Sequence, residues 1–228
     1  MRKAFAWTGA LLFLVSLSSF VYVYGWRLRT PAPDTGSTVA DATVNIVLFT
    51  IFALHHSIMA RTGAKEWIKR LVPQDLERAV YVWIASVLFL AVCWLWRPLP
   101  GLLWHAGGAL SWMLIAVQLI GVGLTLRASQ IVGVLELAGV VQPDHNKPYE
   151  FTTAGPFGVV RHPIYFGWVL IVFATPVMTA TQLLFAVISS AYIVVAIPLE
   201  ERSLLEAFPD KYRTYQSRMR WRLIPGVW

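Results

Sequence analysis

The 228-residue chain contains a single cysteine, and this scarcity excludes two kinds of site. Cys93 has no second thiol in the chain with which to form a disulfide, and it cannot supply a cysteine metal cluster. Charged residues are also few, at 14%, whereas 57% of the residues are hydrophobic. This composition is too apolar for a soluble domain of this size, and it predicts an integral membrane protein.

The N-terminus lacks the cleavage site of a secretory signal peptide. Arg2 and Lys3 precede an apolar stretch that reaches Phe20, as they would in a signal peptide, but residues 19–24 contain no small-x-small pattern. We therefore expect this stretch to be retained as the first membrane span. A cleaved signal is the alternative interpretation.

Six apolar windows are long enough to cross the hydrocarbon of a bilayer. They cover residues 5–25, 43–60, 79–96, 109–126, 163–178 and 183–199. The fifth is short and begins at a proline, so a tilt, a start at the interface and a hairpin with the sixth window all remain open. The predicted fold is an all-α membrane bundle of about six transmembrane helices in one domain, with a four-helix part at 1–126 and a second part at 127–228 that holds the site.

Basic residues are distributed unevenly between alternate loops. If the N-terminus is cytoplasmic, every Lys and Arg except Arg27, Arg29 and Arg97 falls in an inner segment. Cytoplasmic loops carry such an excess, so we assign both termini to the cytoplasm, and the membrane is expected to be a bacterial inner membrane. Because the basic residues flank apolar segments and form no single stripe, the lipid bilayer is the predicted partner and nucleic acid is not.

Two polar clusters flank the last two windows. Arg161 and His162 directly precede Pro163, which suits the first position of a helix, so backbone N–H groups and the positive end of the helix dipole should face the cytoplasm. Glu200 and Glu201 follow the last window and return to the same inner level. This arrangement predicts donors for an anion beside carboxylates for a cation.

A ligand with a carboxylate, an ammonium and a sulfonium would use both clusters. S-adenosylmethionine has this charge pattern, and the aromatic rings of Phe157 and Tyr165 would suit its positive charge. The alternative is purely structural. In that case Arg161 extends to the membrane surface, His162 caps a helix, and the acidic pair begins a solvated helix segment.

The sequence GPFGVVRHPIYFG at residues 155–167, followed by Glu200-Glu201 and by Tyr212 and Tyr215, resembles the isoprenylcysteine carboxyl methyltransferase and phospholipid methyltransferase superfamily. Those proteins are integral membrane enzymes that use S-adenosylmethionine. The resemblance covers residues 142–225. Position by position, it implies that the cofactor contacts Gln142, Thr152, Phe157, His162, Pro163, Tyr165 and Glu200, and we count Arg161 among the catalytic residues.

The first half of the chain resembles the methanethiol S-methyltransferases, through HHSIMAR at residues 55–61, LVPQDLER at 71–78 and WLWRP at 94–98. This resemblance implies methyl transfer to a small thiol, from methanethiol to dimethyl sulfide. Two alternatives are open. One is a methyltransferase for isoprenylcysteine carboxylates or another lipid-like acceptor, although Ala196 stands where those enzymes place an arginine. The other is a non-enzymatic ligand-binding membrane protein, because the HS-x-M-A-R element is also similar to the NnrU-type proteins.

His56 is the predicted catalytic base for the thiol, since its usual pKa suits proton transfer at neutral pH. The alternative is a histidine that is hydrogen-bonded between helices. Adjacent His55 and His56 project about 100° apart on a helix, so we predict no metal site. Tyr212 and Tyr215 lie in a basic, amphipathic stretch that is typical of a helix lying on anionic lipid, and we assign them no chemistry.

Overall fold

The computed structural model describes residues 1–33, 36–59, 72–73, 76–141 and 151–228. The chain forms two compact units that alternate along the sequence. The first contains Met1–His105, Val134–Pro143 and Val177–Ile188, and the second contains Ala106–Gly133, Asp144–Pro176 and Ser189–Trp228. The long helix α8 (Ala180–Ala207) contributes its first residues to one unit and the remainder to the other.

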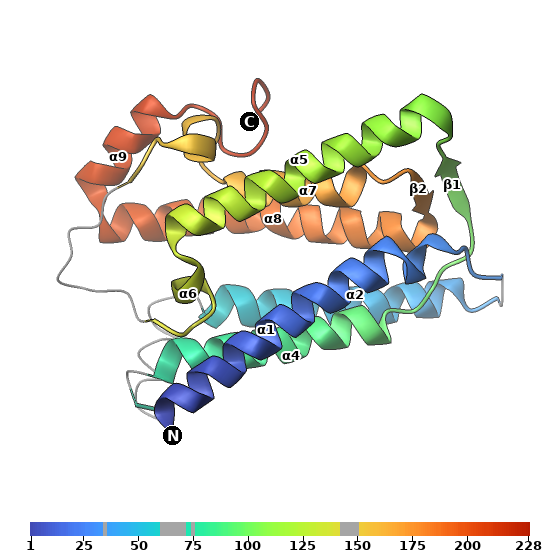
Figure 1. Ribbon diagram of the computed structural model, residues 1–228, viewed down its shortest axis with the longest axis horizontal. Coiled ribbons are helices and arrows are strands. Elements are labelled where there is room, and N and C mark those ends of the chain that lie inside the picture. Colours follow the sequence, from blue (N-terminus) through green and yellow to red (C-terminus); the bar gives the residue numbers. More distant parts are fainter. Residues whose placement is uncertain (34–35, 60–71, 74–75, 142–150) are drawn as a thin grey trace. The chain divides into compact units, whose positions relative to one another are not determined.

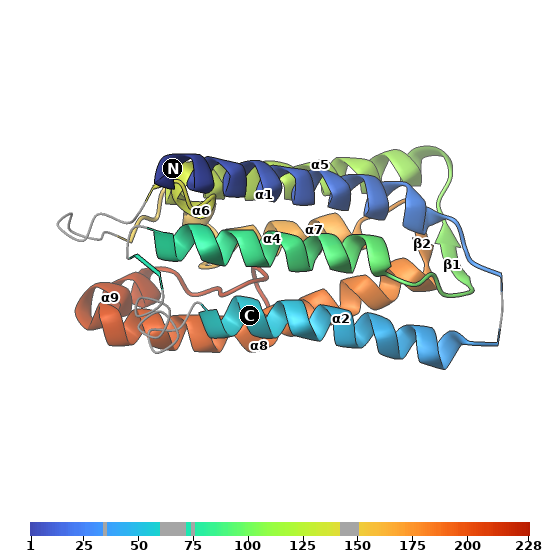
Figure 2. The ribbon, with the colours of Figure 1, turned by 90° about the horizontal axis from the view of Figure 1, so that it is seen from below.

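The first unit is built from three apolar helices, α1 (Arg2–Gly25), α2 (Thr38–Met59) and α4 (Glu77–Leu95). Helix α4 packs against both of the others and lies between them (Figure 2). Aromatic side chains fill the contact: Phe20 stacks on Phe185 with ring centroids 5.6 Å apart, and it also meets Phe89. The short segments η1 (Arg27–Arg29) and α6 (Val134–Leu137) complete this unit.

Buried polar side chains hold the loops at one end of the first unit. Both atoms of the Asn45 amide bond the backbone of Arg97, since Nδ2 donates to its carbonyl and Oδ1 accepts from its N–H, each at 2.8 Å. The hydroxyl of Thr179 donates to the carbonyl of Leu28 at 2.7 Å. These side chains provide hydrogen-bond partners for backbone groups of the loops.

The second unit contains α5 (Gly108–Val132), η3 (Gly155–Gly158), α7 (Pro163–Phe173) and α9 (Pro209–Arg218). Helices α5 and α7 lie side by side along most of α7 (Figure 1). Their backbones approach closely at two glycines, because a Cβ atom added at Gly121 would lie 2.7 Å from the carbonyl oxygen of Gly167. Small residues permit this kind of contact between membrane helices.

Among the residues that the structure describes, five helical segments are long and apolar enough to cross a membrane: Arg2–Arg29, Thr38–Met59, Glu77–Leu95, Gly108–Val132 and Ala180–Ala207. They correspond to five of the six predicted windows, and the chain is an integral membrane protein. The fifth window, residues 163–178, differs. It forms only the 11-residue helix α7, which at 1.5 Å per residue is about half of the length needed to span the hydrocarbon.

Helix α7 stops early because Pro176 follows closely. A proline lacks the N–H that a helix requires, and it disfavours helical geometry at the residue before it. After Pro176 the chain continues as β2 (Val177–Thr179), which pairs antiparallel with β1 (Leu102–His105). The expected hairpin with the last helix is present, since Trp168 on α7 donates its indole N–H to the Ser189 hydroxyl on α8 at 3.0 Å.

Candidate active site at the start of helix α7

Helix α7 begins at Pro163, as the sequence predicts. His162 occupies the N-cap position, its side chain does not cap the helix, and its carbonyl accepts the N–H of Phe166 at 3.0 Å. Since Pro163 has no N–H, no hydrogen-bond acceptor is needed at the first position of the helix. Residues 161–163, which we call the RHP turn, therefore place the Arg161 and His162 side chains directly before the helix.

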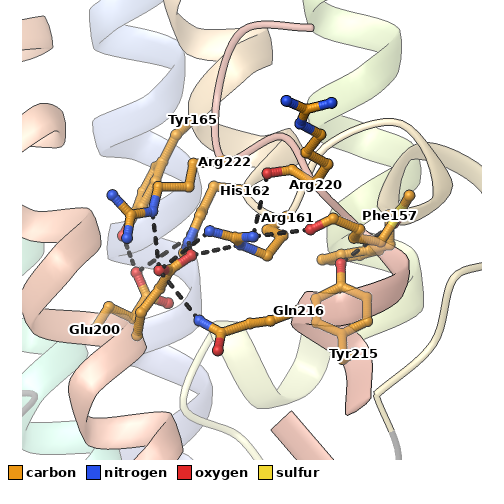
Figure 3. A network of polar contacts seen from close by, with 11 residues as sticks. Phe157, Arg161, His162, Tyr165, Glu200, Tyr215, Gln216, Arg220 and Arg222 are labelled. Atoms are coloured by element: carbon orange, nitrogen blue, oxygen red, sulfur yellow. Dashed lines mark hydrogen bonds and ion pairs between the residues drawn. The ribbon is translucent and has the colours of Figure 1, made fainter. Parts of the chain in front are cut away.

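A second segment runs beside the RHP turn. The N–H of Arg161 donates to the carbonyl of Trp221 at 2.8 Å, and the N–H of His162 donates to the carbonyl of Arg222 at 3.0 Å. The Arg161 guanidinium also donates to the carbonyl of Met219 at 2.8 Å. The C-terminal residues therefore form one wall of the site (Figure 3).

Glu201 lies at the centre of this arrangement and is only 3% exposed. Its Oε1 lies 2.6 Å from Nε of Arg161 and 3.3 Å from Nε2 of His162. Its Oε2 accepts from Nε of Arg222 at 3.1 Å and from the Gln216 amide at 3.5 Å. A buried carboxylate is stable only when it is paired and hydrogen-bonded in this way, so Glu201 organises its neighbours and is not free for a ligand.

Glu200 has a different environment, although it is the adjacent residue on α8. Its side chain is 46% exposed, and it accepts a hydrogen bond from the Tyr165 hydroxyl at 3.0 Å. Nδ1 of His162 lies 3.8 Å from the same carboxylate oxygen. The imidazole of His162 stacks on the ring of Tyr165 at 5.6 Å with an interplanar angle of 8°. Glu200 is thus the member of the acidic pair whose charge can meet a cation.

The two nitrogens of His162 face different carboxylates. Nε2 lies 3.3 Å from Oε1 of the buried Glu201, and Nδ1 lies 3.8 Å from Oε2 of Glu200. His162 is itself buried. The same imidazole therefore joins the buried ion cluster to the exposed carboxylate.

Tyr212 and Tyr215 do not face lipid, contrary to the sequence interpretation. Both are buried, and both rings contact Phe151, with centroids 5.0 Å and 5.7 Å away. The Tyr215 hydroxyl donates to the carbonyl of Phe157 at 3.2 Å. Burial, reinforced by the negative charge of Glu201, raises the pKa of Tyr212, so that this phenol stays neutral. The pair attaches α9 to the segment before the RHP turn.

The remaining predicted cofactor residues have different surroundings. Gln142 lies outside the described residues. Thr152 accepts the N–H of Ala154 at 3.0 Å within its own turn. Phe157 belongs to η3 and is half-buried. Arg161, predicted to be catalytic, is engaged by Glu201 and by backbone carbonyls, as a residue that positions others would be.

His56 belongs to the first unit, near the end of α2. Its Nδ1 lies 2.6 Å from the hydroxyl of Tyr81 on α4, and the ring of His55 stacks on Tyr81 at 5.7 Å and 12°. This contact is the hydrogen bond between helices that was the alternative to a catalytic function. A hydrogen bond to one ring nitrogen also orients the other, so the two interpretations are compatible.

Sequence reasoning missed two residues of the ion cluster, Gln216 and Arg222. It interpreted Glu201, like Glu200, as a carboxylate for a cation, whereas in the structure Glu201 pairs with Arg161 and Arg222. The one available signal was the excess of arginine after Tyr215, which was interpreted as a lipid-binding pattern. Nothing in local sequence indicates that one of those arginines returns to a carboxylate about 20 residues earlier.

Comparison with known proteins identifies relatives of this chain. The phospholipid methyltransferase family matches residues 111–211, which include the RHP turn and the acidic pair. The chain is 37% identical over 224 residues to methanethiol S-methyltransferase 1 of Bradyrhizobium diazoefficiens, covering 92% of this chain and 79% of the relative. It is 38% identical over 224 residues to the methanethiol S-methyltransferase of Mycobacterium tuberculosis, covering 91% of each. No solved structure matches the chain.

The apolar spans, the RHP turn with its acidic pair and these matches define an integral membrane methyltransferase. Within that class, the chain belongs to the methanethiol S-methyltransferase family.

Proposed function

We propose that the protein transfers a methyl group from S-adenosylmethionine to methanethiol, giving dimethyl sulfide. The observation that carries this proposal is the exposed Glu200 carboxylate, held by Tyr165 beside the RHP turn. The names of the relatives support the acceptor, because the matched proteins of Bradyrhizobium diazoefficiens and Mycobacterium tuberculosis are both named methanethiol S-methyltransferase.

The residues of the site fit the chemistry of S-adenosylmethionine. Glu200 would hold a cationic group, and the rings of Tyr165 and Phe157 would lie against positive charge. The positive end of the α7 dipole, at the start of the helix, would suit the carboxylate. Gln142 and Thr152 stay in the proposal as contacts implied by resemblance.

When bound, S-adenosylmethionine supplies a sulfonium methyl carbon, to which the thiolate sulfur bonds as the carbon–sulfonium bond breaks. The surrounding residues must place the thiol in line and exclude water, since a site of low polarity destabilises separated opposite charges. His162 and Arg161 contribute by fixing the start of α7. The ion pair of Arg161 with Glu201 supports a positioning function for this arginine.

We propose that His56 accepts the proton of the thiol. The contact of its Nδ1 with the Tyr81 hydroxyl, at 2.6 Å, would hold the imidazole in a fixed orientation for this transfer. The thiolate, not the thiol, is the nucleophile, so a base that raises the thiolate fraction accelerates transfer.

We further propose that the site faces the cytoplasm of a bacterial inner membrane. The distribution of Lys and Arg supports this orientation, because the excess lies in the segments that would be cytoplasmic. A charged cofactor must arrive from the aqueous side, whereas a small apolar thiol and its product can pass through the bilayer.

The proposal is tested with protein purified in detergent and given methanethiol and methyl-labelled S-adenosylmethionine. Headspace gas chromatography should detect labelled dimethyl sulfide in amounts that depend on the protein. The same reaction with a prenylated cysteine is the comparison. If label appears only as a base-labile methyl ester, the acceptor is a lipid-like molecule and not a small thiol.

A further inference from the structure

The last ten residues, 219–228, lie beyond the residues 111–211 that match the phospholipid methyltransferase family. They nevertheless contact both of the first two residues of the RHP turn. The backbone N–H groups of Arg161 and His162 donate to Trp221 and Arg222, and the Arg161 side chain donates to Met219. The C-terminal segment thus supplies acceptors that the turn does not provide for itself.

This segment has a defined fold of its own. The N–H groups of Leu223 and Ile224 both donate to the carbonyl of Trp228, at 2.9 Å and 3.1 Å, which closes the chain into a loop. Leu223 is buried in a cluster with Ile193 and Ile197 of α8, and the Trp228 side chain packs against the same cluster. The loop is therefore anchored by apolar burial next to the site.

Arg222 joins this loop to the buried carboxylate. Its Nε lies 3.1 Å from Oε2 of Glu201, and its guanidinium lies 5.3 Å from the ring centroid of Trp228. Its side chain is 36% exposed, whereas that of Glu201 is 4% exposed. Arg222 is a second cation on a carboxylate that already pairs with Arg161, and the planar guanidinium suits both the ion pair and the aromatic contact.

We propose that Arg222 is a positioning residue for the methyl donor. Through Glu201 it holds Arg161 and His162, and His162 stacks on the Tyr165 ring whose hydroxyl bonds the exposed Glu200. The inference rests on the proposed function, since it assumes that the methyl donor binds beside Glu200. It divides the acidic pair, with Glu200 facing the ligand and Glu201 joining the C-terminal segment to the RHP turn.

A docked C-terminal segment and a bound methyl donor should then favour each other. Coupling of this kind is reciprocal and typically changes affinity by about 5- to 150-fold. Replacing Arg222 with alanine removes the ion pair and the aromatic contact, so the site is less often in the conformation that binds. The predicted signature is weaker donor binding with little change in turnover at saturating donor.

The experiment compares full-length wild type with R222A, R222K and R218A in detergent. Calorimetry with S-adenosylhomocysteine gives affinity, headspace kinetics give kcat and both KM values, and thermal unfolding gives stability. R222A should raise the Kd and the KM for the donor at least about fivefold, with the KM for methanethiol kept. R222K should recover part of the loss, because lysine keeps the charge but not the planar fork. Arg218 is exposed at the end of α9, so R218A should behave as wild type.

Wild-type affinity in R222A would overturn the inference. A lower melting temperature accompanied by joint changes in kcat and both KM values would also overturn it, because this pattern indicates general unfolding. If R222A does not purify as a folded protein, W228L is measured instead. Leucine keeps apolar cover but removes the ring beside Arg222, and unchanged donor affinity in W228L would likewise contradict the proposal. Failure of the proposed function is a separate result, in which wild type itself binds no S-adenosylhomocysteine.

Discussion

Replacing Glu200 with glutamine removes one negative charge from the site and changes little else. The side chain keeps its shape, and the amide oxygen can still accept the Tyr165 hydroxyl that lies 3.0 Å from the carboxylate. Two unit charges about 4 Å apart attract by about 4 kcal/mol at an effective dielectric constant of 20 and by about 1 kcal/mol in water. Because the Glu200 side chain is 46% exposed, we take a value of about 2 kcal/mol, or about 30-fold in affinity.

The assay is calorimetry with two ligands, S-adenosylmethionine and S-adenosylhomocysteine. Both carry the ammonium, and only the first carries the sulfonium. Equal weakening of both ligands in E200Q assigns Glu200 to the ammonium, whereas weakening of S-adenosylmethionine alone assigns it to the sulfonium. The matched control is E206Q, which removes an exposed carboxylate of the same helix that pairs with Arg202 at 3.0 Å. If E200Q binds both ligands as tightly as E206Q does, the placement of the cofactor beside Glu200 is refuted.

Three further predictions address the base and the fold. H56Q should lower kcat by about 10²- to 10⁴-fold, the range for a general base, with donor affinity kept in calorimetry, and an unchanged kcat would remove His56 from catalysis. G167A should destabilise the protein by about 1–3 kcal/mol, since its Cβ would crowd the α5 backbone. The control is G123A, which should not lower the melting temperature because a Cβ there meets nothing within 4 Å. N45A should also lower the melting temperature, because it removes two hydrogen bonds from the buried Asn45 amide to the backbone of Arg97, each contributing about 0.5–1.5 kcal/mol. A wild-type melting temperature would contradict this account.

Local rules predicted much of the fold. Hydropathy located five helices that are long enough to cross a membrane, and the position of Pro163 gave the first residue of α7. The same rules failed a few residues later, where an apolar run reaching residue 178 was expected to continue as helix. Pro176 ends that helix, and Val177–Thr179 pairs as a strand with residues far away in the sequence. A window average of hydropathy does not register such a break.

Only part of the site was predicted, because local sequence does not show tertiary contacts. His162, Tyr165 and Glu200 lie together because the start of α7 and the last turns of α8 place side chains that local sequence can identify. Adjacent glutamates look alike in a sequence, yet they project about 100° apart on a helix, so one faces out and the other is buried. Glu201 pairs with Arg161 and Arg222, and Tyr212 packs on Phe151, about 60 residues earlier. Pairings of this kind depend on tertiary packing.

The central claim, that the methyl donor binds at the RHP turn, is tested most directly by covalent labelling. Purified protein is irradiated with methyl-labelled S-adenosylmethionine, with and without excess S-adenosylhomocysteine, and the labelled peptides are sequenced. The account predicts label that the competitor displaces, on peptides that contain residues 157–165 or residues 199–202. Displaceable label that lies only on peptides of the first unit, with none on these two segments, would contradict it.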